Sequence, residues 1–368
     1  MKKENLYEKI IADIQEKIID NTYALNDRIP TEFELAEQYQ VSRITSKRAL
    51  EELKNEGYIY RKQGSGSYVS DAFKYRKNPA AGNYVAVIMP QYVSSGSFAA
   101  TIRGTSSVVQ ENDLSLKLYT NVKSQEEVSA LLQELYRQNI AGIIYYPFSD
   151  VENVAVLNML ATEHFPIVTI DKYFECVPVS SVISDNKKGG ELSAEYLIAN
   201  GHRTIAFISD IPFEAATSIR DRYFGYCAAL QAHDIKVDMN LIVQGGWTSE
   251  YPRTYNKKVY TEIIRKLLAQ GVTAVCAAND IIATSIIHAS CDMGVAIPEQ
   301  LSIVGFDNSE MAEYIRPPLT SVRQDFVQMG RTAGALICSS RTTGKLDYTR
   351  TVLPVSLVER ETVAKISN

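Results

Sequence analysis

Arg43 and Lys47 lie four residues apart in a stretch that reads as a helix, so both fall on one face of that helix. A guanidinium group can bind guanine O6 and N7 through two hydrogen bonds, and an ammonium group can contact phosphate or a base edge. This face could therefore contact the major groove of DNA. Surface helices with two cations are also common in proteins that bind no nucleic acid. The neighbouring elements must therefore show whether this is a DNA-binding helix or an ordinary surface helix.

A second set of polar side chains directly follows apolar segments in the later part of the chain. In open α/β sheets, ligands bind beyond the carboxyl ends of the strands. Carboxylates, amides and tyrosyl groups there suit an uncharged, polyhydroxylated ligand, because each can bridge neighbouring hydroxyl groups. A phosphate site would need a glycine-rich turn at a helix start, and none follows these segments. The residues in question are Tyr92, Tyr146, Asp171, Asp185, Asp210, Asn279, Asp280 and Asp307.

The elements that must position the basic helix form a small module. Ser42 can act as its N-cap, and an earlier helix starts with the capping-box spacing of Thr31 and Glu34. A first helix before them has apolar residues four positions apart. Two short strands at 58–61 and 67–69 follow around a glycine-bearing turn. Three helices and a hairpin in about 70 residues predict a winged helix-turn-helix.

The stretch IPTEFELAEQYQVSRITSKRALEELKNEGYIYRKQGSGSYV resembles the N-terminal domain of GntR-family transcription regulators, over nearly all of residues 5–70. The resemblance implies that Arg43 contacts a guanine or nearby phosphate and that the wing reaches the minor groove. Many relatives carry Arg where this chain has Phe33, so that base contact is expected to be missing, and Glu32 could instead accept from a cytosine amino group. The expected DNA-contacting residues are Glu32, Ser42, Arg43, Thr45, Lys47, Gln63, Gly64 and Gly66.

From residue 84 onward, short apolar segments alternate with helical patterns, which indicates parallel sheets covered by helices on both faces. The segment AGIIYYP…PIVTID is similar to TAVCAAND…LSIVGFD, so two similar lobes are expected. The fold class is therefore α/β: a winged helix-turn-helix followed by two lobes of doubly wound parallel sheet. The predicted strands are 84–89, 115–120, 141–146, 166–170, 180–184, 204–209, 273–278 and 301–306.

The motifs SIRDRYFGYCAAL, AVCAANDIIA, IPEQLSIVGFDN, PPLTSVRQDF and LPVSLVERET resemble the effector-binding domain of LacI/GalR regulators, which is similar in fold to periplasmic sugar-binding proteins. The resemblance covers about residues 84–360. It implies effector contacts in which Arg222 holds adjacent hydroxyls and Trp247 stacks on a sugar ring. The full set is Asp171, Arg222, Trp247, Asn279, Asp307 and Gln324, with Tyr92, Ser97, Phe98 and Asp280 as weaker candidates.

Structural roles remain open for several of these residues. Asp280 and Asp307 could cap helices that follow their strands, Arg222 could pair with Asp221 or Asp210, and Trp247 could belong to the core. The expected domains are 1–71 for DNA binding, 72–82 as linker and 83–368 for effector binding and dimerisation. The expected lobes are N (83–184 and 325–345) and C (185–323 and 346–368).

The combination resembles the arabinose-responsive repressors of Gram-positive bacteria. It implies a homodimer that presents two winged helices to a roughly palindromic double-stranded operator. A small neutral sugar, with a pentose such as L-arabinose favoured, would close the lobes about crossing segments near Asp185 and 321–324 and release the DNA. Another effector, or a corepressor-type response, is the alternative.

Composition limits the other possibilities. The net charge is −5 and the pI about 5.6, unlike a nonspecific nucleic-acid binder, although residues 43–77 hold nine basic and four acidic residues. Five scattered cysteines without C-x-x-C and four dispersed histidines predict neither a disulfide framework nor a metal site, and no cofactor is expected. The start of the chain lacks a signal-peptide pattern, and no apolar run is long enough to span a membrane. We therefore expect a cytoplasmic protein without membrane contact.

Two other functional classes explain less of the sequence. A transport-type sugar-binding protein would account for the lobes but not for the helix-turn-helix. An enzyme would need a nucleophile–base pair, metal ligands or a nucleotide fingerprint, and the Ser, His and Cys positions suggest none of these. The expectation is a protein without catalytic activity.

Overall fold

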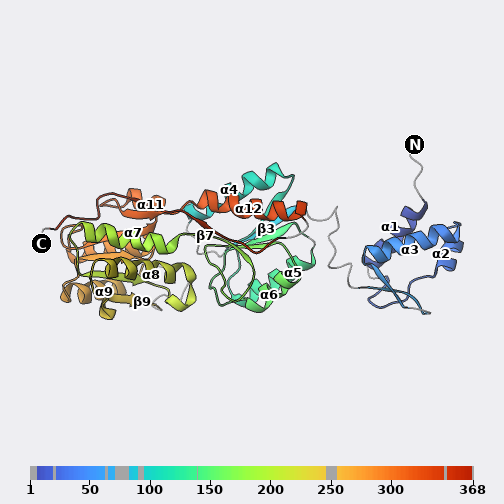
Figure 1. Cartoon of the computed structure of the whole chain (residues 1–368), viewed down its shortest axis with the longest axis horizontal. Helices are drawn as coiled ribbons and strands as arrows, with labels where there is room; N and C mark the ends of the chain where they lie inside the picture. The colour runs from blue at the N-terminus through green and yellow to red at the C-terminus, as the bar shows by residue number, and fades with distance from the viewer. Residues whose placement is uncertain are drawn as a thin grey trace. The chain divides into compact units, whose positions relative to one another are not determined.

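The computed structural model describes residues 6–19, 22–62, 65–70, 83–89, 95–138, 140–245, 255–343 and 346–366. The chain divides into a small N-terminal unit, mainly residues 1–82, and a large unit, mainly residues 83–368, with residues 133–140 grouped with the N-terminal unit (Figure 1).

The N-terminal unit is a winged helix-turn-helix, as the sequence predicts. Its helices are α1 (Leu6–Ile19), α2 (Glu32–Gln38) and α3 (Arg43–Asn55), and its wing is an antiparallel hairpin of β1 (Ile59–Lys62) and β2 (Gly66–Val69). The hairpin strands differ from the predicted limits by one residue. Its small core is formed by Ile10, Ile14, Ile18, Ile29, Leu35, Ala49, Leu50, Leu53, Ile59 and Val69.

The predicted helix caps are confirmed. Thr31 Oγ1 accepts a hydrogen bond from Glu34 N at 3.3 Å, and the Glu34 carboxylate accepts one from Thr31 N at 2.6 Å, which completes the capping box. Ser42 Oγ accepts a hydrogen bond from Thr45 N at the start of α3. Ser46 Oγ then donates to the Glu32 carbonyl at 2.7 Å, which ties α3 to the first turn of α2. These bonds fix which side of α3 faces outward.

The first sheet of the large unit is wholly parallel, in the order β13-β7-β6-β5-β3-β4. Helices α4 and α12 lie over one face, and α5 and α6 lie on the other (Figure 1). The elements are β3 (Tyr84–Ile88), α4 (Ser95–Glu111), β4 (Ser115–Tyr119), α5 (Gln125–Arg137), β5 (Gly142–Tyr145), α6 (Val154–Thr162), β6 (Ile167–Ile170), β7 (Ser180–Ser184), α12 (Phe326–Thr343) and β13 (Arg350–Leu353).

The second sheet has the order β14-β12-β11-β10-β8-β9, with only β14 antiparallel to its neighbour. Helices α7 and α8 pack along each other, as do α9 and α10. The elements are α7 (Asn186–Ala199), β8 (Ile205–Ser209), η2 (Phe213–Ala215), α8 (Thr217–Ala232), η3 (Met239–Leu241), β9 (Ile242–Gln244), α9 (Lys257–Ala269), β10 (Ala274–Ala277), α10 (Asp280–Met293), β11 (Ser302–Asp307), α11 (Glu310–Tyr314), β12 (Thr320–Arg323) and β14 (Ser356–Val358).

One predicted lobe limit is wrong. Residues 346–368 were expected to lie wholly in the second lobe, but β13 pairs in parallel with β7 in the first sheet, from Arg350 opposite Ser181 to Leu353 opposite Ser184. The chain therefore passes between the lobes three times: after β7, after β12 and after β13. The backbone N–H of Asp185 donates to the Leu353 carbonyl at 2.8 Å, so the first and third crossings are joined.

Two glycines allow α7 and α8 to cross at close range. A Cβ atom at Gly190 would lie 2.0 Å from the Arg222 carbonyl oxygen, and one at Gly225 would lie 1.9 Å from the Lys187 carbonyl oxygen. No larger residue fits at either position without moving a helix backbone. The crossing brings Asn186, at the start of α7, against Arg222 in α8.

Among the described residues, no helix is long and apolar enough to span a membrane.

Candidate functional site

The first candidate site is the outer face of α3. Arg43 and Lys47 are exposed on this face and Thr45 is half-buried, whereas Ser46, Ala49 and Leu50 lie in the core. Within the described part of the chain, neither the guanidinium of Arg43 nor the ammonium of Lys47 has an ion-pair or hydrogen-bond partner. Both cations are therefore available to an external anion or base edge.

Two other predicted DNA contacts already have partners in the protein. The Glu32 carboxylate pairs with Arg61 of β1 at 3.1 Å, which ties the start of α2 to the wing. The Ser42 hydroxyl caps α3 and also lies 2.8 Å from Thr45 Oγ1. A hollow of about 390 Å³ beside them is lined by Thr31, Glu32, Phe33, Arg43, Leu50, Arg61, Lys62, Gly66 and Ser67.

The wing presents aromatic and basic side chains on one face. The rings of Tyr60 and Tyr68 stack with centroids 5.7 Å apart, and Lys62 Nζ lies 5.4 Å from the Tyr68 ring. Gly66 has φ +119°, and a Cβ atom there would meet Arg28 Nε at 3.1 Å, so the hairpin itself requires this glycine. Gln63 and Gly64, also expected to contact DNA, lie outside the described residues.

The second candidate site is a polar cluster in the large unit, made of Asp171, Lys172, Arg222, Asp307 and Gln324. Arg222 is buried at its centre. Its Nε donates to Asn186 Oδ1 at 2.9 Å, and its Nη1 donates to the Ala278 carbonyl at 2.6 Å. The guanidinium also stacks 3.7 Å from the centroid of the Phe306 ring. The alternative pairing of Arg222 with Asp210 or Asp221 is not observed in the described residues; the carboxylate beside Arg222 is Asp307, 3.7 Å away.

Asp307 and Gln324 form the part of the polar cluster that belongs to the second sheet. Asp307 ends β11 in a left-handed conformation with φ +108°, and Gln324 Nε2 donates to its carboxylate at 2.6 Å. Burial raises the pKa of Asp307 to about 7, against the opposing effect of Arg222. Gln324 Oε1 is buried and has no hydrogen-bond partner in the described residues, so it is an acceptor that a hydroxyl group could satisfy.

Asp171 and Lys172 bring the first lobe into the cluster. Asp171 follows β6 with φ +70°, and its carboxylate lies 2.6 Å from Lys172 Nζ, with both side chains buried. Burial alone would raise the pKa of Asp171, but Lys172 and Arg222 hold it below its usual range. Ser218 Oγ, at the start of α8, donates to the same carboxylate at 3.4 Å. The Lys172 ammonium also lies 4.5 Å from the centre of the Tyr146 ring.

Asn279 and Asp280 were both candidates, and the structure gives them structural roles. Asn279 Oδ1 caps α10 by accepting from Ile282 N at 2.9 Å. Asp280 is buried beneath β11 and β12, where it accepts hydrogen bonds from Ser309 N and Ser321 Oγ, each at 2.6 Å. Burial raises its pKa to about 6. Both carboxylate oxygens of Asp280 are thus used to hold the loop before α11, and Asn279, only half-buried, is the better placed of the two to contact a ligand.

The remaining candidates are less well supported. Phe98 packs against the core of the first lobe, and Ser97 lies half-buried one residue before it on α4. Tyr92 and Trp247 lie outside the described residues.

Sequence reasoning missed several residues that complete the cluster. Lys172 follows Asp171 directly and Asn186 follows Asp185 directly, so their positions after a strand could have indicated them. Ser218 carries no comparable sequence signal. A contact between the lobes was also missed: Arg220 of α8 lies 3.6 Å from Asp150, which follows β5.

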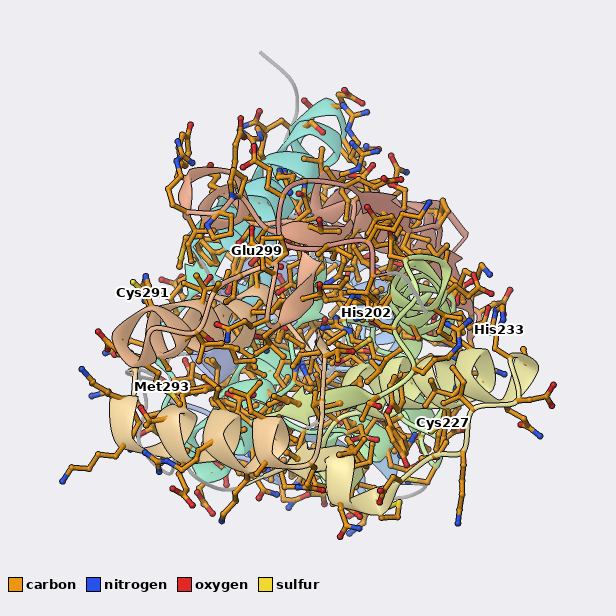
Figure 2. All side chains as sticks on the ribbon, turned by 90° about the vertical axis from the view of Figure 1, so that its left-hand side faces the viewer. His202, Cys227, His233, Cys291, Met293 and Glu299 are labelled. Atoms are coloured by element: carbon orange, nitrogen blue, oxygen red, sulfur yellow. The ribbon has the colours of Figure 1, made fainter. Side chains whose placement is uncertain are left out.

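The histidines and cysteines of the second lobe do not gather into a site. His202, Cys227, His233 and Cys291 lie apart from one another (Figure 2). His202 is buried and held by Thr273 Oγ1 at 2.9 Å and by the Ala364 carbonyl at 3.1 Å. Within the described ranges, no group of three His, Cys, Asp or Glu side chains could hold a metal ion.

Comparison with known families agrees with this division of the chain. Residues 6–69 match the family described as bacterial regulatory proteins, gntR family. Residues 194–363 match the periplasmic binding protein-like domain. Both predicted resemblances are therefore confirmed.

Similar proteins match over most of the chain. An arabinose metabolism transcriptional repressor of Geobacillus stearothermophilus is 28% identical over 343 residues, which cover 92% of each chain. A protein of the same description from Halalkalibacterium halodurans is 28% identical over 91% of this chain and 89% of its own length. The solved complex of the transcriptional regulator CelR with cellobiose has a TM-score of 0.67 and 25% identity, and covers 91% of this chain and all of that chain.

Proposed function

We propose that this transcriptional regulator, which joins a GntR-type DNA-binding domain to a periplasmic-binding-protein-like domain, represses sugar-utilisation genes and leaves its operator when a small sugar binds. The observation that carries the proposal is the polar cluster around Arg222, where carboxylate, amide and cationic groups from both lobes meet at the carboxyl ends of β6 and β11. The repressors matched along nine-tenths of the chain support it.

The proposed DNA-contacting side chains differ in whether they already have partners within the protein. Arg43 would bind a guanine edge, and Lys47 a phosphate or base edge, because both are exposed and without partners among the described residues. Thr45 and the wing residues Gln63, Gly64 and Gly66 would add contacts beside them. Glu32 and Ser42 would act mainly by positioning the wing and capping α3, since each is held by the protein.

The proposed sugar contacts are Arg222, Asp307, Gln324, Asp171 and Asn279, with Lys172 added by the structure. Arg222 and Lys172 would donate to hydroxyl oxygens, and the carboxylates and Gln324 Oε1 would accept from hydroxyl hydrogens. Such a balanced set of cations and anions suits a neutral ligand. L-arabinose or another aldopentose is favoured because the similar repressors are named for arabinose. The cellobiose complex makes a disaccharide the next choice.

Coupling between the sites would run through closure of the lobes. Arg222 and Asp171 belong to different lobes, so a sugar that binds both favours one arrangement of the three crossings. In a homodimer this change would alter the spacing of two winged helices on a palindromic operator. The coupling must be reciprocal, so operator DNA would weaken sugar binding by the same factor.

The test is thermal unfolding of the full chain against a panel of pentoses, hexoses, disaccharides and sugar phosphates. A ligand that binds only the folded state stabilises it by RT ln(1 + [L]/Kd). We expect one neutral sugar to raise the melting temperature and to be recovered unchanged. If no sugar shifts the transition, the sensor part of the proposal is wrong. If a sugar shifts it and tightens operator binding, the corepressor-type response replaces release.

A further inference from the structure

The start of α3 carries an exposed apolar side chain that the fold does not need. Ile44 is 81% exposed, although Ser46, Ala49, Leu50 and Leu53 of the same helix are buried. Two residues along a helix correspond to a rotation of about 200°, so Ile44 points away from the side that Ser46 fixes to α2. Ile44 is thus near the centre of the outer face.

A second exposed apolar side chain lies at the start of α2. Phe33 is 63% exposed and lines the same hollow as Arg43. Neither Phe33 nor Ile44 belongs to the core of the N-terminal unit or packs against it. Both side chains thus leave apolar area in water, which opposes the tendency of such area to be buried.

The charges around these two side chains indicate what covers them. Lys47 lies three residues after Ile44 on the same helical face, Arg43 directly precedes it, and Arg61 and Lys62 line the hollow beside Phe33. The guanidinium of Arg48, on the same side, lies 4.1 Å from the centroid of the Tyr7 ring and already has this contact within the protein. An apolar contact beside the unpaired cations Arg43 and Lys47 fits an anionic surface with small apolar groups. In the major groove of DNA, that group is the C5-methyl of thymine.

We propose that Ile44 and Phe33 read thymine methyl groups next to the base contacted by Arg43, so that each operator half-site contains thymines recognised through their methyl groups. This inference rests on the proposed DNA-binding function and adds a base preference that Arg43 and Lys47 alone do not supply. A methyl group leaves the base-pairing and the charge of the DNA unchanged, and for that reason its contribution can be measured separately.

The experiment uses the full-length protein and an operator selected from a random duplex library. Each thymine in the selected half-site is then replaced by deoxyuridine, which removes only the methyl group, and affinity is measured at fixed salt concentration. Burying one methyl group is expected to change affinity about fourfold, so replacement in both half-sites should weaken binding about fifteenfold.

The variants I44A and F33A assign the effect to its side chain. I44A should bind the thymine operator more weakly and should lose the response to deoxyuridine at one position, and F33A should lose it at another. Lys47→Ala should weaken both DNAs equally. Leu25→Ala, which shortens another exposed aliphatic side chain in the turn between α1 and α2, should change neither. Folding of each variant is checked by its circular dichroism spectrum.

The outcomes separate this inference from the proposed function. If the library yields no specific operator, the DNA-binding proposal itself fails. If specific binding occurs but no deoxyuridine replacement weakens it, or the dependence persists in both variants, the methyl-reading inference is wrong. If I44A or F33A changes only the molecular mass of the assembly in light scattering, the apolar residues form a protein contact, which also overturns the inference.

Discussion

The two candidate sites differ in how far the protein has already satisfied their functional groups. On α3, Arg43 and Lys47 stand in solvent without partners in the described chain. In the polar cluster, Arg222, Asp171 and Asp307 are held by one another and by neighbouring groups at 2.6–3.7 Å. The contrast suits their proposed ligands. The regularly spaced phosphates of DNA attract exposed cations. A small neutral sugar instead needs hydrogen-bond donors and acceptors that the protein holds in place before binding.

The comparison also implies different consequences of mutation. Removing an exposed cation should change only binding, because the fold does not use it. Removing a member of the cluster should change both ligand binding and stability, since it leaves buried partners unsatisfied.

Arg43→Ala should have the largest effect, on operator affinity alone. A good bidentate contact contributes about 1–3 kcal/mol of discrimination, and a dimer loses two such contacts, so specific affinity should fall about a hundredfold or more. The measurement is operator binding against a scrambled duplex. Unchanged sugar affinity is the internal control. Retention of operator affinity would mean that α3 is not the recognition helix.

Arg222→Ala should abolish the sugar response and destabilise the large unit. It removes the hydrogen bonds to Asn186 and Ala278 and leaves Asp307 without its nearest cation, and loss of a buried ionic partner typically costs about 3 kcal/mol. Denaturant unfolding and sugar titration measure the two effects. A variant with normal stability and a normal sugar response would show that the cluster has neither role.

Asp280→Ala should lower the stability of the protein without a comparable loss of sugar affinity, although Asp280 lies at the same edge of the second sheet as Asp307. The Asp280 carboxylate accepts from Ser309 N and Ser321 Oγ, so its loss should reduce stability by about 2 kcal/mol while sugar affinity remains within a few fold. Asp307→Ala is the matched comparison and should lose the sugar response. A larger loss of affinity at Asp280 than at Asp307 would reverse the proposed roles.

Asp307 should make a smaller contribution to the pH dependence of the free energy of unfolding, and its direction can be predicted. Its pKa is about 7 in the folded state and near 3.8 when unfolded, so the folded state binds more protons between these values. Stability from this group is therefore full below about pH 4 and is lost as pH rises toward 7. Relative to the wild type, Asp307→Asn should become progressively more stable from pH 5 to pH 7. Parallel profiles for the two proteins would contradict the raised pKa.

Local signals in the sequence sufficed for much of the fold. The capping box at Thr31 and Glu34 and the N-cap at Ser42 are confirmed because each depends on neighbouring residues only. The eight apolar strands were placed correctly to within about a residue or two. The short strands β9, β12, β13 and β14 were missed. β13 was also assigned to the wrong lobe, because its pairing with β7 joins residues about 170 positions apart.

The candidate site was predictable in position but not in detail. The end of a strand places Asp171 and Asp307 at the correct edge of each sheet, as the sheet order requires. Sequence could not tell that Asp280 turns beneath β11, because the direction of a side chain there depends on Ser309 and Ser321. It also could not place Ser218, since its contact with Asp171 depends on how the two lobes meet.

The most direct test of the central proposal is the affinity of the full chain for its selected operator, measured with and without the sugar found in the thermal panel. Coupling of the usual size predicts that saturating sugar weakens operator binding by about 5–150-fold, and that operator weakens sugar binding by the same factor. Operator affinity that is unchanged at saturating sugar would contradict the account, because the two sites would then be uncoupled.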